Sequence, residues 1–380
     1  MSLSTLPLGY CTNVHAGLTV KDVLAGLDRF TVPVMKQVGR PVAAGLWLAR
    51  PVVDELLADP SGLAKFADEL AARKLACYTL NAFPYGDFHA ARVKENVYLP
   101  DWSQPERLTY TAECATALAA FLPEGTDGSI STLPLGFKGF DHPADFDDAC
   151  IRNLISCAEW FDRVKRDTGR TVRLAIEPEP FCRLETTPEA IAFFKKLWRQ
   201  SGAKERIVRE HIGLCYDVCH QAVEFESISE SVASLDAAGV RINKVQISCA
   251  VQLDDPAKNA AGRDALRHFV EPRYLHQTFS RPAVDRKPSS PRSPSRLAAA
   301  TGLARSCIGT SRQGASPIRI HRRRRHHRCH AALAATARGA HGARSAGMAD
   351  RWPRQPLVVH RQAARTATIF AGSHSSRIGS

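Results

Sequence analysis

Acidic and imidazole side chains close two apolar runs of the sequence, and together they could hold a metal ion. Glu177 and Glu179 close LAIEPEP, where two prolines restrict the backbone. Asp217 and His220 close LCYDVCH. Glu177, Asp217 and His220 offer the carboxylate oxygens and imidazole nitrogen that Zn²⁺ and Mn²⁺ prefer, with Mg²⁺ as a third option. The alternatives are a solvated loop acid at Glu177 and a turn-capping Asp217 beside a surface histidine.

The run VRINKVQIS places Lys244, Gln246 and Ser248 on one face if it forms a strand. A lysine on the inner face of a sheet is rarely buried without a partner, so Lys244 predicts a carboxylate or an anionic or carbonyl substrate nearby. Lys244 and His15 are the candidate catalytic groups, because an ammonium or an imidazole can move a proton or stabilise charge. For His15 alone, a hydrogen-bonded core histidine is an equally good interpretation.

Other polar side chains stand where apolar runs end, and they are candidates for binding a small polar substrate. They are Asn13, Asn81, Tyr85, Glu179 and Gln246. Amide, phenol and carboxylate groups at such places give the few directional hydrogen bonds that orient a small ligand.

The elements that must position these groups alternate between strand and helix. Apolar runs predict strands at 6–15, 42–49, 75–83, 128–135, 171–180, 211–220 and 240–248. Helical spacing predicts helices at 20–30, 51–74, 105–122, 144–167 and 187–200. The second helix should break at Asp59-Pro60, and the last should have Thr186 or Thr187 as its N-cap and Pro188 as its first residue.

About seven βα units predict an α/β protein of the (β/α)₈ TIM-barrel type. A doubly wound open sheet is the alternative, but no GxGxxG follows the first strand. In a (β/α)₈ barrel the chemistry takes place at the carboxyl ends of the strands. The candidate residues fall at those ends, so the sequence predicts that they converge on one mouth of the barrel.

Several motifs resemble a known family. LGYCTNVH, TLNAFPYGDFH, VKENVYLPDW, SISTLPLG, EPEP, CYDVCHQAVEFE and EPRYLHQ together resemble the EboE-type metabolite-traffic family, over roughly residues 6–278. That family is similar to the xylose-isomerase-like TIM barrels. The resemblance implies metal ligands at the ends of strands 5 and 6, matching Glu177, Asp217 and His220. It also implies a role in exporting or processing a specialised metabolite.

The wider superfamily also includes DNA-repair enzymes of the endonuclease IV type, and here the sequence departs from their pattern. Those enzymes use histidines after strands 3 and 4 and on strand 7. This chain has Asn81, Ser131 or Thr132, and Gln246 near those places. A three-zinc DNA-repair site is therefore not expected, whereas a site with one or two metals for a small polyol, sugar-like or carbonyl compound is.

The positive charge of the chain is confined to its C-terminal part. The formal net charge is +13, and residues 281–380 hold 19 Arg and one Lys against two acids. Residues 280–380 are rich in Arg, Ala, Ser and Pro and include IHRRRRHHRCH, so they predict a disordered tail. Residues 1–279 would then form a barrel that lacks its last strand.

Translation of a GC-rich gene out of frame yields such a composition, so the tail is interpreted as a frameshift product. The first and seventh strands would then be open edges, and the metal site would be impaired. A basic arm that binds nucleic acid is the less favoured alternative, because genuine arms mix Lys with Arg and intersperse aromatic residues. No specific nucleic-acid partner is therefore expected.

Eleven cysteines without close-set pairs predict reduced, mostly buried thiols and a cytoplasmic location. Cys215 and Cys219 are interpreted as structural, because Cys-x₃-Cys is not a zinc-knuckle spacing. Neither a secretory signal nor an apolar run long enough for membrane insertion is expected. Two functions remain open: a metal-dependent isomerase or hydrolase, and a non-catalytic protein that binds a metabolite. The oligomeric state is left open.

Overall fold

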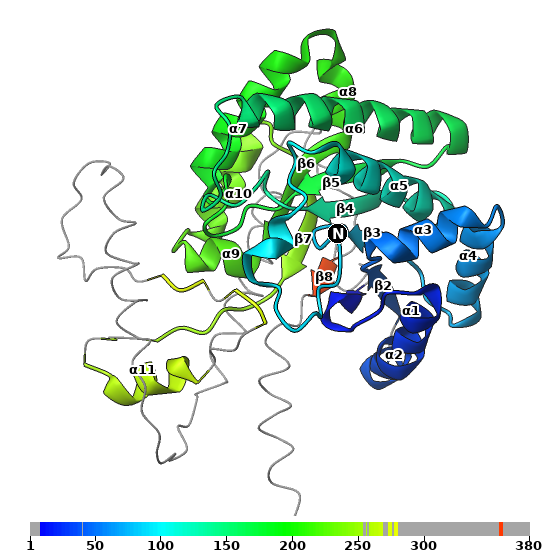
Figure 1. Cartoon of the computed structure of the whole chain (residues 1–380), viewed down its shortest axis with the longest axis horizontal. Helices are drawn as coiled ribbons and strands as arrows, with labels where there is room; N and C mark the ends of the chain where they lie inside the picture. Colours follow the sequence, from blue (N-terminus) through cyan, green and yellow to red (C-terminus); the bar gives the residue numbers. More distant parts are fainter. Residues whose placement is uncertain are drawn as a thin grey trace, which may run out of the picture.

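Eight parallel strands form the framework of the part of the chain that is described. The structure, a computed structural model, describes residues 8–39, 41–253, 256, 258–268, 273–275 and 277–279, together with the backbone of 357–359. The strands pair in sequence order and close into a barrel (Figure 1). They are β1 (Leu8–Cys11), β2 (Val42–Leu46), β3 (Thr79–Asn81), β4 (Gly128–Thr132), β5 (Val172–Ile176), β6 (Ile212–Asp217), β7 (Ile242–Ile247) and β8 (Leu357–Val359). The predicted α/β barrel with seven leading strands is confirmed.

The eighth strand corrects one expectation from the sequence. β1 and β7 were expected to have open edges, but β8 lies between them and pairs with both in parallel. The local reason is that Leu-Val-Val is a short β-branched apolar run, which the sequence analysis passed over inside a basic segment. The remainder of 280–380, including the proposed frameshift product and IHRRRRHHRCH, lies outside the described residues.

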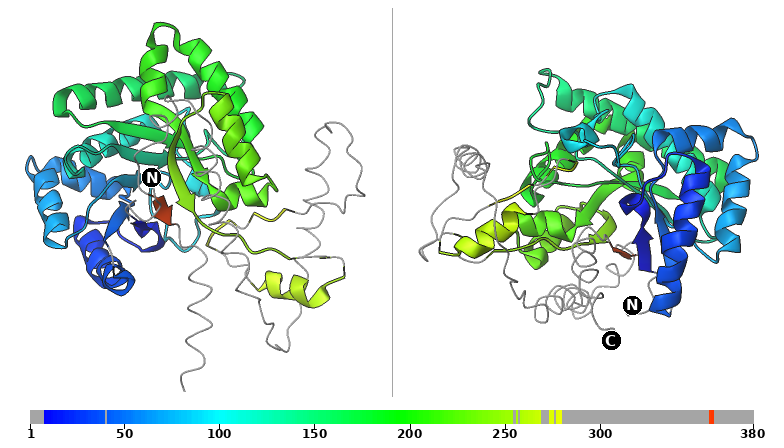
Figure 2. Two further views of the ribbon diagram at one scale, coloured as in Figure 1. Left: turned by 180° about the vertical axis from the view of Figure 1, so that it is seen from behind. Right: turned by 60° about the horizontal axis from the view of Figure 1, so that its bottom comes forward.

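Helices cover the outside of the strands, as the views from behind and below show (Figure 2). They are α1 (Val20–Gly26), α2 (Val32–Val38), α3 (Arg50–Ala58), α4 (Gly62–Ala72), α5 (Pro105–Phe121), α6 (Phe146–Thr168), α7 (Thr187–Ser201), α8 (Glu205–His211), α9 (Val218–Val223) and α10 (Ile228–Ala237). A further helix, α11 (Ala260–Arg267), lies apart from the barrel (Figure 1). The predicted break at Asp59-Pro60 separates α3 from α4. Thr186 caps α7 as predicted, and Pro188 is its second residue rather than its first.

Polar side chains inside the barrel are paired with one another. The ammonium of Lys244 on β7 crosses the interior and donates to Ser131 Oγ (2.9 Å) and to the carbonyl of Leu80 (3.1 Å). Ser129 and Thr79, in the same interior, share a hydrogen bond of 3.1 Å. The two bonds of Lys244 make its burial possible, because they replace hydrogen bonds that the ammonium would make with water. The hydroxyls of Ser129 and Thr79 satisfy each other in the same way.

Gly213 on β6 makes room for a bond between two strands that are not neighbours. The amide of Asn243 on β7 reaches across β6 and donates to the carbonyl of Leu174 on β5 at 2.7 Å. A Cβ at Gly213 would lie 2.4 Å from the carbonyl oxygen of Arg241 and 2.6 Å from the amide nitrogen of Asn243. Only glycine fits at this position.

Candidate metal and substrate site at the barrel mouth

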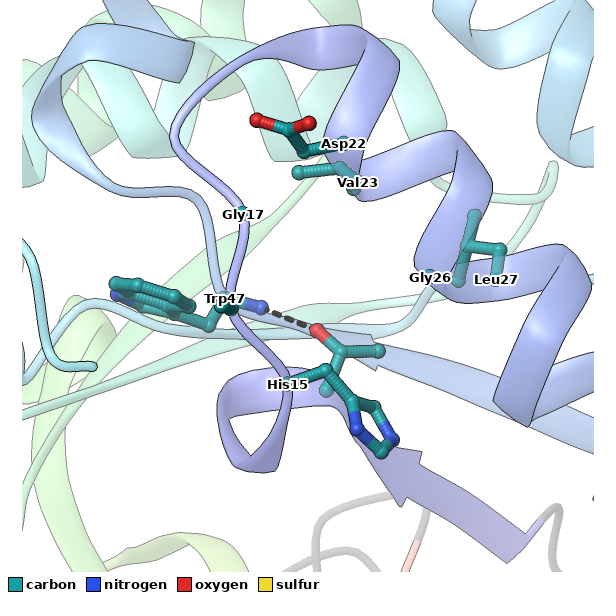
Figure 3. Close-up of a pocket in the computed structure, with 9 residues that line it drawn as sticks. His15, Gly17, Asp22, Val23, Gly26, Leu27 and Trp47 are labelled. Carbon is teal, nitrogen blue, oxygen red and sulfur yellow. Dashed lines mark hydrogen bonds between the residues drawn. The ribbon is translucent and has the colours of Figure 1, made fainter.

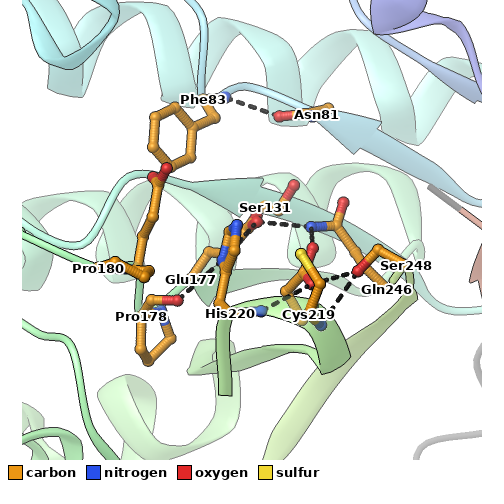
Figure 4. Close-up of polar contacts among 12 residues, drawn as sticks. Asn81, Phe83, Ser131, Glu177, Pro178, Pro180, Cys219, His220, Gln246 and Ser248 are labelled. Atoms are coloured by element: carbon orange, nitrogen blue, oxygen red, sulfur yellow. Dashed lines mark hydrogen bonds and ion pairs between the residues drawn. The ribbon is translucent and has the colours of Figure 1, made fainter. Parts of the chain in front are cut away.

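Four of the predicted site residues gather at the carboxyl ends of neighbouring strands. Glu177 directly follows β5, Asp217 ends β6, His220 lies in the first turn of α9, and Gln246 lies near the end of β7. Glu177 and Asp217 are only 4% and 2% exposed, and Gln246 is fully buried. We call these four residues the mouth cluster (Figure 4).

Asp217 is both a helix cap and a member of the mouth cluster. The predicted strand at 211–220 ends at Asp217, because its Oδ1 accepts the backbone N–H groups of Cys219 (2.8 Å) and His220 (3.4 Å) and so begins α9. The hydroxyl of Ser248 donates to the same oxygen. The turn-capping interpretation is therefore correct for Asp217, and the cap places His220 beside it rather than on the surface.

The amide of Gln246 joins the two carboxylates. Its Nε2 donates to Glu177 Oε1 at 2.6 Å and to Asp217 Oδ2 at 3.2 Å (Figure 4). Two buried carboxylates repel each other unless a donor or a cation lies between them. The amide NH₂ group takes that position in this structure.

The imidazole of His220 lies beside the same carboxylates. Its Nδ1 is 3.1 Å from the carbonyl of Pro178 and 3.6 Å from Glu177 Oε1. Burial raises the pKa of Glu177, and Asp217 and Glu179 raise it further. Burial lowers the pKa of His220, but the carboxylates of Asp217, Glu179 and Glu177 outweigh it and raise the pKa overall. Both shifts have the same origin, the crowding of carboxylates in a buried site, and a cation bound among them would relieve that repulsion.

The donor atoms of the mouth cluster fit a divalent metal. Glu177 Oε2 and Gln246 Oε1 are buried and make no hydrogen bond among the described residues. Ligand atoms of Asp217, Cys219 and His220 lie within 4.8 Å of one another. Burial and the neighbouring Asp217 raise the pKa of the Cys219 thiol, which disfavours a thiolate ligand. Carboxylate, imidazole and amide donors are the set that remains, and they suit Zn²⁺, Mn²⁺ or Mg²⁺.

Lys244 lies deeper in the barrel than the mouth cluster. It is 2% exposed, and its partners are the hydroxyl of Ser131 and the carbonyl of Leu80. The sequence correctly indicated that a buried lysine needs partners. A carboxylate or a substrate was expected in that role, and the structure shows a hydroxyl and a carbonyl instead.

His15 belongs to a different environment on the β1 side. Its Nε2 lies 2.8 Å from the hydroxyl of Tyr10, and its ring stacks on Phe30 with centroids 3.7 Å apart. It also lines a small pocket with Asp22 and Trp47 between the β1 loop and α1 (Figure 3). The described contacts pair the partly buried His15 with Tyr10 and Phe30 and do not join it to the mouth cluster, so a catalytic role for His15 remains a prediction.

The amide candidates at the ends of β1 and β3 are buried, and each is bonded to a residue two positions away in the chain. Asn13 Oδ1 accepts the thiol of Cys11 at 2.9 Å. Asn81 Oδ1 accepts the backbone N–H of Phe83 at 3.0 Å. These bonds fix both side chains at the strand ends, where substrate binding was predicted.

Tyr85 packs toward the helix layer. Its ring meets that of Tyr110 edge-on at 5.1 Å, and the guanidinium of Arg107 lies 5.8 Å from its centroid. Both of these neighbours belong to α5. The structure therefore brings Tyr85 together with α5, and a contact with substrate remains a prediction.

Glu179 has partners that the sequence analysis did not identify. Gln277 Nε2 donates to Glu179 Oε1 (3.0 Å), to the hydroxyl of Tyr98 (3.0 Å) and to the carbonyl of Pro180 (3.1 Å). Tyr98 and Gln277 lie in the motifs VKENVYLPDW and EPRYLHQ, which contributed only to the family resemblance. No spacing rule links residues so far apart in the chain.

Comparison with known proteins gives matches only among solved structures. No protein-family model and no curated sequence matches the chain. Among the described residues, no helix is long and apolar enough to cross a membrane.

The similar solved structures include two epimerases and an endonuclease-family protein. A 3-keto-D-glucoside 4-epimerase from E. coli has 13% identity, 80% coverage of this chain, 100% of its own and a TM-score of 0.39. A D-allulose 3-epimerase from Methylomonas sp. has 16% identity, and the match covers 72% of this chain and 85% of the epimerase with a TM-score of 0.42. A family 2 AP endonuclease from Brucella melitensis has 13% identity, and the match covers 71% of this chain and 92% of the endonuclease with a TM-score of 0.41. These scores assign no function to the chain, and its architecture is defined by its own strand pairing.

Proposed function

We propose that the barrel mouth binds a divalent metal and a small polyhydroxylated carbonyl compound, and that the chain acts as a sugar-isomerase-like enzyme in metabolite processing. The observation that carries this proposal is the buried pair Glu177 and Asp217, held together by Gln246 beside His220. Buried acids are costly to a fold unless they serve a site. The EboE-type role in metabolite traffic is the finer form of the same proposal.

Glu177, Asp217 and His220 would hold the metal, and Zn²⁺ and Mn²⁺ suit this set better than Mg²⁺ because of the imidazole. Gln246 can offer its amide oxygen instead of its nitrogen once a cation replaces the bridging NH₂ group. A bound divalent ion supplies Lewis acidity, which polarises a carbonyl or orients a hydroxyl group.

The remaining residues of the chain would orient the substrate and balance charge. Glu179, with Tyr98 and Gln277, presents carboxylate, phenol and amide groups beside the mouth cluster, a set that suits sugar hydroxyls. Lys244 is a positioning residue, because its buried ammonium holds the β4 and β3 strand ends and lies within electrostatic range of Glu177. We assign no proton transfer to His15, because Tyr10 and Phe30 are its described neighbours.

A non-catalytic metabolite-binding protein is the second candidate, and one observation favours it. The amide of Gln246 donates to one oxygen of each carboxylate, so hydrogen bonds already hold the two acids together. A mouth of this kind could bind a polar ligand through hydrogen bonds alone.

The experiment is a turnover screen of aldoses and ketoses with Mn²⁺, Zn²⁺ or Mg²⁺, on the whole chain and on Glu177→Gln. Turnover that needs metal and falls at least about 100-fold in Glu177→Gln supports the enzyme. The control is Asp68→Asn on the exposed face of α4, which should keep full activity. Metal-independent ligand binding without turnover would favour the binding protein instead.

A further inference from the structure

A second group of possible metal ligands lies at the opposite end of the barrel from the mouth. His211 is the last residue of α8 and directly precedes β6, Glu210 is its neighbour, and Asp162 lies on α6. The helices α6 and α8 pack side by side (Figure 1). Ligand atoms of the three residues lie within 4.8 Å of one another. We call them the α6–α8 cluster.

The hydrogen bonding of His211 leaves one ring nitrogen available. Its Nδ1 lies 2.9 Å from the carbonyl oxygen of Val172, the first residue of β5. A carbonyl oxygen only accepts, so Nδ1 carries the hydrogen and the ring is fixed in orientation. The side chain is fully buried, and Nε2 has no hydrogen-bond partner among the described residues. Metal-ligating histidines commonly show this pattern, in which a backbone carbonyl holds the other nitrogen.

The distance between the ligand atoms of Asp162 and His211 is too long for a hydrogen bond and close to the distance between two ligands of one metal ion. Asp162 Oδ1 lies 3.8 Å from His211 Nε2. A direct hydrogen bond would need about 2.7–3.2 Å. Metal–ligand bonds of about 2.0–2.2 Å in a tetrahedron place neighbouring ligand atoms about 3.4 Å apart. A shift of a few tenths of an ångström would therefore bring Nε2 and Oδ1 to one ion.

The charges around the cluster show what an ion would have to replace. Lys165 binds one oxygen of Glu210, and Arg206 lies 3.5 Å from the other. Asp162 pairs weakly with Arg166 at 3.4 Å. An ion bound here would take one Glu210 oxygen from Lys165, which is partly exposed and can turn to solvent.

We propose that Asp162, Glu210 and His211 form a structural divalent-metal site that fixes α6 to α8 at the end of the barrel opposite the mouth. One imidazole and two carboxylates are donor types that suit Zn²⁺. Residues at this end of a (β/α)₈ barrel usually serve stability rather than chemistry. The site does not depend on the function proposed for the mouth.

The test measures Zn²⁺ bound per chain after equilibrium dialysis, with ZnCl₂ as the only added ligand. The background is Asp217→Asn, which weakens the mouth cluster. Adding Asp162→Asn should remove one equivalent of Zn²⁺, whereas adding Asp167→Asn, an exposed position on the same helix, should remove none. Comparing these matched variants cancels Zn²⁺ bound elsewhere, including at the histidines of residues 320–330.

A second measurement keeps the test informative if one variant is unstable. Zn²⁺ should raise Tm by at least about 2 °C in the Asp167→Asn chain, and this rise should disappear in Asp162→Asn and in Glu210→Gln. Equal Zn²⁺ content and equal Tm shifts in Asp162→Asn and Asp167→Asn would overturn the proposal. Because the Zn²⁺ measurement is made in the Asp217→Asn background, its outcome does not depend on the mouth. Failure of the mouth to bind metal in the wild-type chain would count against the proposed function and leave this site standing.

Discussion

The amide nitrogen of Gln246 lies 2.6 Å from Oε1 of Glu177, in a fully buried contact between β7 and the end of β5. The same nitrogen reaches Asp217 on β6. One neutral side chain thus holds two acids that would otherwise repel each other. Its position is also the one that a metal ion bound by both acids would take.

Replacing Gln246 with leucine should lower the stability of the fold and make that stability depend more on bound metal. Gln246→Leu keeps most of the volume but leaves Glu177 and Asp217 without their shared donor, which should cost about 1–3 kcal/mol in the free energy of unfolding. Urea unfolding in the presence of a chelator measures this loss, and added Mn²⁺ should recover part of it. Gln37→Leu, at an exposed position of α2, is the control and should change stability little. Equal stability of the two variants would show that the Gln246 bridge, its hydrogen bonds to Glu177 and Asp217, does not stabilise the fold.

Gly213→Ala should destabilise the barrel strongly. The new Cβ would lie 2.4 Å from the backbone oxygen of Arg241, directly before β7, which cannot move without shifting the start of that strand. We expect a loss of about 1–3 kcal/mol or more, measured by thermal or urea unfolding. Gly26→Ala is the matched control, because nothing lies within 4 Å of its added Cβ. Equal stability of Gly213→Ala and Gly26→Ala would contradict the close packing around Gly213.

Glu189 should make stability depend on pH below its ordinary pKa of 4.5. Burial raises the pKa of this carboxyl, but the N–H groups of Glu185 and Thr186 and the ammonium of Lys138 outweigh it, so the pKa in the folded protein is lowered. The stabilisation is therefore fully present above pH 4.5 and is lost as the pH falls through the lowered value.

Unfolding measured between about pH 6 and 3 should show this loss in the wild type and a smaller one in Glu189→Gln. Glu124→Gln, at an exposed position, should follow the wild type. A Glu189→Gln chain that loses stability as steeply as the wild type would contradict the assignment.

The seven leading strands could be predicted because a buried parallel strand produces a continuous apolar run that local pattern alone reveals. Glu177, Asp217 and Gln246 could be placed at one mouth because parallel strands bring their carboxyl ends together. The bridge itself could not be predicted, since side-chain torsions decide which acid Gln246 reaches.

Other features depended on contacts that sequence spacing does not encode. Tyr98 and Gln277 meet at Glu179 from distant loops, so no local pattern marks them. The helix α9 was included in a predicted strand because Val218 and Cys219 are apolar, although Asp217 is a good N-cap. β8 is three residues long, below the length at which alternation is recognisable.

Binding of Mn²⁺ tests the central claim most directly. Titration followed by the electron paramagnetic resonance signal of free Mn²⁺ counts bound ions without needing a substrate. The account predicts that the Mn²⁺ site at the mouth loses affinity at least about 10-fold in Asp217→Asn and in Glu177→Gln, and is unchanged in Asp68→Asn. Mn²⁺ binding that is absent, or that is equal in all four proteins, would contradict a metal site at the barrel mouth.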